Sequence, residues 1–155
     1  MKTLIIMRHA KTEEGGAGKK DFDRELIFKG LKDASEMALW IRKKYALIDE
    51  IFSSAAKRTQ HTASIVKEIC GGNLILLDEL YQADADEILD QIQQGKKNSR
   101  LILVVGHNPA VSELASNLSH SSIDLKPSDV VVFELDNKAW QTALKVKSFK
   151  HHSVY

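Results

Sequence analysis

The sequence has little of what several classes of protein require. Among its 155 residues there is one cysteine, Cys70, so a framework of internal disulfide bonds is excluded. No apolar run approaches the roughly 20 residues that cross a membrane, and the first run, Leu4–Met7, is too short for a signal peptide. We therefore expect a soluble, cytoplasmic protein in which Cys70 is buried as a small apolar side chain.

Charge of one sign is not in excess either. The chain carries 22 Lys and Arg against 21 Asp and Glu, a net charge of +1. Such a balance lacks the polybasic field that binds nucleic acid or an anionic membrane, so we expect neither partner. His120, His151 and His152 have no companion Cys or carboxylate residues at ligand spacing, and no metal or other cofactor is expected. Any basic site must be local.

The patterns that are present alternate between strand-like and helix-like, within a length that fits one domain spanning residues 1–155. This alternation favours a three-layer α/β/α fold, with a mainly parallel sheet and helices on both faces. The expected strands are residues 4–7, 51–52, 74–77 and 101–105, and the expected helices cover residues 31–45, 55–70, 88–92 and 108–118. Residues 130–135 and 140–146 are expected to form a hairpin at a sheet edge, turning at 136–138.

Local signals mark the ends of some elements. Ser53 and Ser54 are expected to cap the second helix, and Asn108 the helix that Pro109 opens, because short polar side chains accept hydrogen bonds from free helix N–H groups. The glycine-rich residues 15–18 are expected to form a flap beside the ligand site.

Two expected strands each end in a histidine. Arg8 and His9 follow the run 4–7, and His107 follows the longest apolar run, 101–105. Arg58 lies at the start of the helix after the second strand, where unpaired N–H groups favour an anion. Because parallel strands share one carboxyl edge, we expect these four residues to converge on one phosphate group.

This set of residues suits phosphoryl transfer. Arginine forks bind the equatorial oxygens of the transferred group, and a neutral imidazole accepts the phosphoryl group as a covalent intermediate. One histidine must be neutral to attack, whereas the other can stay protonated to stabilise charge.

Three segments also resemble the signatures of the histidine phosphatase superfamily, in order along most of the chain: Arg8–Ala10, Ser53–Ala63 and Val105–Pro109. The short length and the segment Asp23–Leu26 before Gly30 are similar to the compact SixA-type phosphohistidine phosphatases. The resemblance implies a phosphoglycerate mutase-like fold and a metal-free phosphatase. It also implies His9 as phosphoryl acceptor, with phosphate ligands at Arg8, Arg24, Arg58 and His107. The implied substrate is a histidine-phosphorylated protein, such as a phosphotransfer domain or carrier.

The chain departs from the superfamily pattern at Ala10, Ala55 and the segment Arg24–Ile27, where Ile27 cannot cap the following helix. The resemblance makes Glu79 a candidate proton donor to the leaving group, although it can equally be a solvated residue at the strand exit. A small-molecule phosphomonoesterase is an alternative, and a phosphate-binding module without catalysis is a further one. A mutase is disfavoured, because the 22 residues from Asp78 to Ser99 are too few for a covering subdomain.

Overall fold

The computed structural model describes residues 1–16 and 18–155. Its centre is one six-stranded sheet in the order β3-β2-β4-β1-β5-β6. The strands are β1 (Lys2–Arg8), β2 (Glu50–Ser54), β3 (Asn73–Leu77), β4 (Leu101–Gly106), β5 (Val130–Leu135) and β6 (Val146–His152). The first four are parallel, and β5 and β6 pair antiparallel at one side. The expected mainly parallel sheet and its edge hairpin are confirmed.

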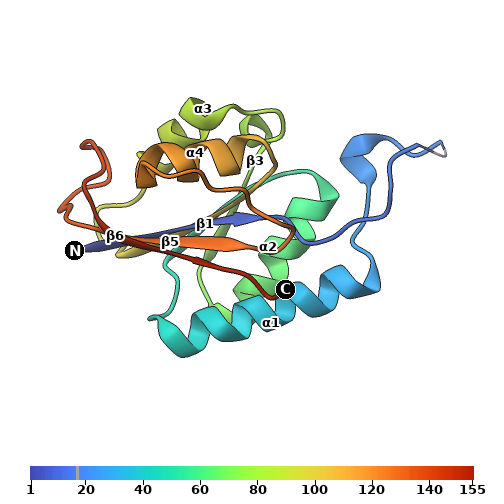
Figure 1. The fold of residues 1–155 in the computed structure, drawn as a ribbon, viewed down its shortest axis with the longest axis horizontal. Coiled ribbons are helices and arrows are strands. Elements are labelled where there is room, and N and C mark those ends of the chain that lie inside the picture. Colours follow the sequence, from blue (N-terminus) through green and yellow to red (C-terminus); the bar gives the residue numbers. More distant parts are fainter. Residues whose placement is uncertain (17) are drawn as a thin grey trace.

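Helices cover both faces of the sheet (Figure 1). The first pair is α1 (Phe28–Lys44) and α2 (Lys57–Cys70), and the second is α3 (Ala85–Ile92) and α4 (Ala110–Ser119). β1 is apolar on both faces because it contributes to both cores: Ile5 packs with the first pair, and Leu4 and Ile6 with the second. Cys70 is buried as expected. No helix in the described ranges is both long and apolar enough to cross a membrane.

The second strand of the edge hairpin begins later than its alternating pattern indicated. We expected a strand over residues 140–146, but β6 starts at Val146 and residues 136–145 form the connection. Trp140 explains the difference, because its ring is fully buried and its Nε1 donates to the Ser99 carbonyl at 2.8 Å. The Trp140 side chain therefore belongs to a loop and not to a strand. Hydrogen bonds of the Asn137 amide stabilise this loop.

Neither expected helix cap is present. β2 extends through Ser53 and Ser54, so α2 begins only at Lys57, without a side-chain cap. Asn108 also does not cap α4, which starts at Ala110. Its amide instead donates to the Leu125 carbonyl and its oxygen accepts from Ser112. These polar side chains therefore connect separate segments near the carboxyl ends of the strands. α1 begins after Ile27 without a side-chain cap, as expected.

The chain between β1 and α1 projects beyond the carboxyl end of β1 (Figure 1). It is closed at its base by a bridge between Thr12 and Leu26, and it carries the short 3₁₀ helix η1 (Asp21–Asp23). The expected flap at residues 15–18 lies only partly within the described residues, because position 17 is outside them. At the base, a Cβ on Gly30 would lie 2.2 Å from the Lys11 carbonyl oxygen, so this close crossing requires glycine.

Candidate active site

His9 follows β1 directly and lies at the carboxyl edge of the sheet. It is 8% exposed, and its Nδ1 is 2.8 Å from the carbonyl oxygen of Ala10. A carbonyl can only accept, so Nδ1 carries the hydrogen and the lone pair is on Nε2. Burial, together with the nearby His107, Arg58 and Arg8, lowers the pKa of His9 to about 3. At neutral pH the ring is therefore a neutral base with a defined orientation.

His107 stands beside His9 because β4 is the parallel neighbour of β1, with Arg8 in register with Gly106. The two ring centroids are 5.3 Å apart. His107 Nε2 lies 2.8 Å from Ser54 Oγ, which already accepts from the Ala56 N–H, so the hydroxyl hydrogen is available to Nε2. His107 Nδ1 is buried without a hydrogen-bond partner among the described residues.

The sequence allows one of the two histidines to stay protonated, but the surroundings of His107 disfavour a positive charge on its ring in this structure. Burial, and next the Arg58 charge, lower the pKa of His107 to about 4, so both rings are neutral at pH 7. The reason is that the site holds several cations and little solvent, and a second positive ring is unfavourable there.

The arginines surround the two rings. Arg8 Nη1 donates to the Leu125 carbonyl at 3.0 Å, and Arg58, only 6% exposed in the first turn of α2, donates from both terminal nitrogens to Asp21. The Nε atoms of Arg8 and Arg58 are buried without partners among the described residues. Arg24 donates to Glu13, Asp21 and Thr12. A buried guanidinium with an unused N–H is suited to an anionic ligand.

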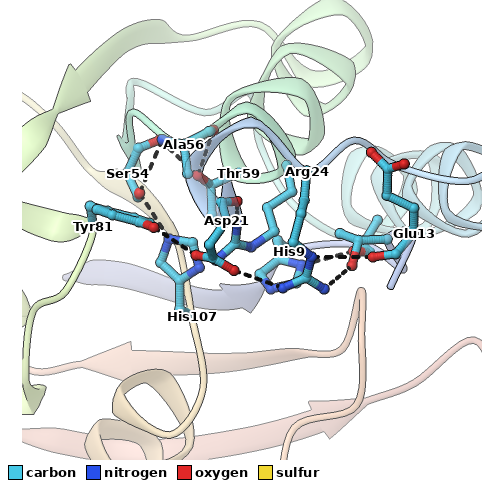
Figure 2. A network of polar contacts seen from close by, with 12 residues as sticks. His9, Glu13, Asp21, Arg24, Ser54, Ala56, Thr59, Tyr81 and His107 are labelled. Atoms are coloured by element: carbon cyan, nitrogen blue, oxygen red, sulfur yellow. Dashed lines mark hydrogen bonds and ion pairs between the residues drawn. The ribbon is translucent and has the colours of Figure 1, made fainter. Parts of the chain in front are cut away.

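Asp21 connects these groups, and sequence reasoning did not identify it. Its carboxylate accepts from Tyr81 Oη at 2.6 Å, from Arg24 at 2.9 Å and from Arg58 at 3.0 Å. Figure 2 shows the Asp21 side chain between those of Tyr81 and Arg24. The hydrogen bond from Tyr81 and the two guanidinium groups hold the pKa of Asp21 well below its usual range. The only signal in the sequence is an acid three residues before Arg24.

The four residues expected to bind phosphate and His9, the expected phosphoryl acceptor, line one cavity. This cavity of about 250 Å³ is bordered by Arg8, His9, Arg24, Arg58 and His107, and also by Lys11. A second cavity, of about 350 Å³, adjoins it and shares Arg58, His107 and Asn108. Glu79 is exposed on the 3₁₀ helix η2 (Asp78–Leu80) and lines neither cavity. In the described part of the chain, no three His, Cys, Asp or Glu side chains are grouped as metal ligands would be.

Comparison with known proteins places this site in a family. A model of the histidine phosphatase superfamily, branch 1, matches residues 4–88, which is more than half of the 155 residues. The chain therefore belongs to the histidine phosphatase superfamily. An uncharacterized protein of Mycobacterium tuberculosis is 30% identical over 116 residues, which cover 75% of this chain and 72% of that protein. An uncharacterized chloroplastic protein of Arabidopsis thaliana is 27% identical over 151 residues, covering 90% and 69%.

Solved structures share the fold. The protein histidine phosphatase SixA complexed with tungstate superposes with a TM-score of 0.80 at 21% identity, covering 97% of this chain and 96% of that chain. A phosphoserine phosphatase from Entamoeba histolytica, in complex with 3-phosphoglyceric acid, has a TM-score of 0.68 at 18% identity, covering 96% of each chain. At these identities the likeness shows the phosphoglycerate mutase-like fold.

Proposed function

We propose that this protein is a phosphatase that removes the phosphoryl group from phosphohistidine on another protein, through a phosphohistidine intermediate on His9. The observation that carries the proposal is the orientation of His9. Its Nδ1–H is held by the Ala10 carbonyl, so the Nε2 lone pair is the available nucleophile. The low pKa, about 3, keeps this lone pair unprotonated at neutral pH.

In the first step, Nε2 of His9 attacks phosphorus. A new N–P bond forms and the N–P bond of the substrate histidine breaks. That ring carries a proton on its other nitrogen before the step, so it departs as neutral imidazole. In the second step, water attacks the phosphoryl group on His9 and releases inorganic phosphate, which regenerates the neutral ring. Neither step consumes a cofactor.

The surrounding donors match the charge that develops on the phosphoryl oxygens. The Nε–H groups of Arg8 and Arg58 and the Nδ1 of His107 are buried and have no partner among the described residues, and each would be satisfied by one oxygen. A dianionic ligand beside His107 would raise the pKa of that ring and allow it to carry a proton during the reaction. Arg24 lines the same cavity and supplies further charge.

The proposed protein substrate is supported by the openness of the site and by the similarity to SixA. Between β3 and β4 the chain forms only η2 and α3, so no additional domain from this connection covers the site. A folded partner can therefore present its phosphohistidine directly. It would also add an interface whose binding energy positions the reacting bond, which a free metabolite cannot do.

Parallel steady-state measurements test the proposal. A cognate histidine-phosphorylated domain from the same cell should be hydrolysed with a kcat/KM at least ~100-fold above that for 3-phosphoglycerate or a sugar phosphate, which corresponds to about 2.7 kcal/mol. If a metabolite is the better substrate and every phosphohistidine protein tested stays intact, the protein is a small-molecule phosphomonoesterase. If neither class is hydrolysed but phosphate binds, it is a binding module without catalysis.

A further inference from the structure

The two cavities that meet at Arg58, His107 and Asn108 differ in charge. The smaller one, beside His9, is lined by the cations Arg8, Lys11, Arg24 and Arg58, and no carboxylate is among the described residues that border it. Within residues 1–16 and 18–155, the larger one is lined by the carboxylates of Asp21, Asp84 and Glu113, and Arg58 is its one Lys or Arg residue. Because the two cavities share Arg58, His107 and Asn108, a substrate whose phosphoryl group occupies the first cavity can extend into the second.

The negative charge of the larger cavity is not cancelled within it. Arg58 is paired with Asp21 at 3.0 Å, and His107 is neutral at pH 7 because its pKa is about 4. Asp84 and Glu113 therefore remain as the net charge. A sphere of 350 Å³ is about 9 Å across, close to the Debye length of ~8 Å at physiological ionic strength, so both carboxylates act on a ligand there.

Helix dipoles oppose this charge but are too small to reverse it. The α3 and α4 N-termini border the cavity, and each contributes about half a positive charge. A carboxylate with a full negative charge lies at each of these N-termini. Asp84 caps α3 and accepts from the Glu87 N–H at 2.8 Å, and Glu113 lies in the first turn of α4. The net charge facing a ligand stays negative.

Arg58 links the acidic lining to the reacting centre. Its side chain is 7% exposed, it borders both cavities, and its Nε is buried without a partner in the described ranges. An oxyanion bound to this nitrogen would therefore lie where the two cavities join, next to the larger cavity that Asp84 and Glu113 line.

We propose that the larger cavity is the leaving-group subsite, and that Asp84 and Glu113 select phosphoryl donors whose leaving group is neutral or cationic, such as imidazole or an amine, against donors that carry a carboxylate. The inference rests on the proposed phosphatase function, and it narrows the substrate class by charge. Phosphohistidine fulfils the condition, since its ring is neutral on departure. A phosphoglycerate does not, because its carboxylate would face two others.

The experiment uses three aryl phosphates of similar size: 4-(aminomethyl)phenyl, phenyl and 4-carboxyphenyl phosphate. Their kcat/KM values are measured with the wild-type protein at low and high salt. Their affinities are measured by calorimetry with the His9→Ala variant, in which no turnover interferes. At low salt we expect both kcat/KM and the affinity to be at least about tenfold higher for the cationic compound than for the anionic one. At high salt both ratios should shrink.

Charge-neutral variants assign the effect to residues. Glu113→Gln keeps the side-chain size, and Asp84→Asn keeps an oxygen that can cap α3. Each variant should lower the ratio of the affinity for the cationic compound to that for the anionic compound by at least about threefold. Asp90→Asn is the matched control, because Asp90 is an exposed carboxylate on the same helix that does not line the cavity, and the ratio should be that of the wild type.

The outcomes separate this inference from the function on which it rests. Equal or reversed affinities for the cationic and anionic compounds overturn the subsite, even if all three are hydrolysed. The subsite is also overturned if Asp90→Asn loses the preference for the cationic compound. The same holds if both Glu113→Gln and Asp84→Asn keep this preference. If the wild type hydrolyses neither these compounds nor a histidine-phosphorylated domain, but the expected affinity order and its loss in the variants are found, the subsite stands and the phosphatase function fails.

Discussion

The buried state of His9 predicts that this side chain contributes to the destabilisation of the protein by acid. The pKa of His9 is about 3 in the folded protein, against the 6.5 of an imidazole in an unfolded chain. Between these two pH values the unfolded state binds a proton that the folded state does not. The free energy of unfolding therefore rises with pH across this window, by up to about 1.4 kcal/mol per pH unit, and is flat above it.

The magnitude follows from the two pKa values. When the pH falls from 7.5 to 5, the imidazole is protonated in the unfolded state but not in the folded state over about 1.5 pH units. His9 therefore lowers the free energy of unfolding by about 2 kcal/mol over this range. Urea denaturation at a series of pH values measures it. In His9→Gln this part of the acid destabilisation should be absent, so the variant should lose about 2 kcal/mol less than the wild type over the same range.

His61→Gln is the control, because it also removes one histidine, but an exposed one on α2. Its stability should change with pH as that of the wild type does. If His9→Gln and the wild type show parallel curves between pH 7.5 and 5, His9 is not buried as a neutral ring. The argument that its Nε2 is a permanently available nucleophile would then lose its basis.

Three further outcomes are expected. Arg58→Ala should lower kcat/KM by about 10²–10³-fold, or ~3–4 kcal/mol, as loss of a major oxyanion donor does. Arg58→Lys should recover little, because an ammonium group cannot reproduce the planar fork that donates twice to Asp21 and still offers its Nε–H to the phosphoryl group; recovery to near the wild-type rate by Lys would contradict this role. Vanadate should inhibit and EDTA should not, and loss of activity in EDTA with recovery on adding magnesium would refute a metal-free mechanism. Gly30→Ala should lower the melting temperature, because the added Cβ would clash with the Lys11 backbone; an unchanged melting temperature would show that this crossing can relax.

The sequence was sufficient to predict which candidate site residues lie together, because simple rules apply to them. His9 and His107 follow uniformly apolar strands, and the carboxyl ends of parallel strands share one edge, so adjacency in space could be predicted without coordinates. Arg58 was accessible by the same reasoning, as the helix after β2 must start at that edge. The family resemblance added Arg24, which lines the same cavity.

Asp21 and Tyr81 could not be found in this way. They lie 60 residues apart, in segments without a helical or strand period, and meet only because the chain before α1 folds over the sheet edge. Trp140 misled the pattern analysis for a related reason, since alternating apolar residues indicate burial but not which element provides it. The polar groups Ser54 and Asn108 bind distant partners in preference to helix ends, which local capping preferences do not anticipate.

The central claim is that the phosphoryl group passes through Nε2 of His9. Rapid quenching of wild-type protein with a radiolabelled phosphoryl donor, under alkaline conditions in which phosphohistidine survives, measures this directly. We predict transient label on His9, chemically an Nε2-phosphohistidine, and none in a folded His9→Ala variant that still binds phosphate. Label on a serine or aspartate, or turnover by His9→Ala at the wild-type rate, would contradict the account.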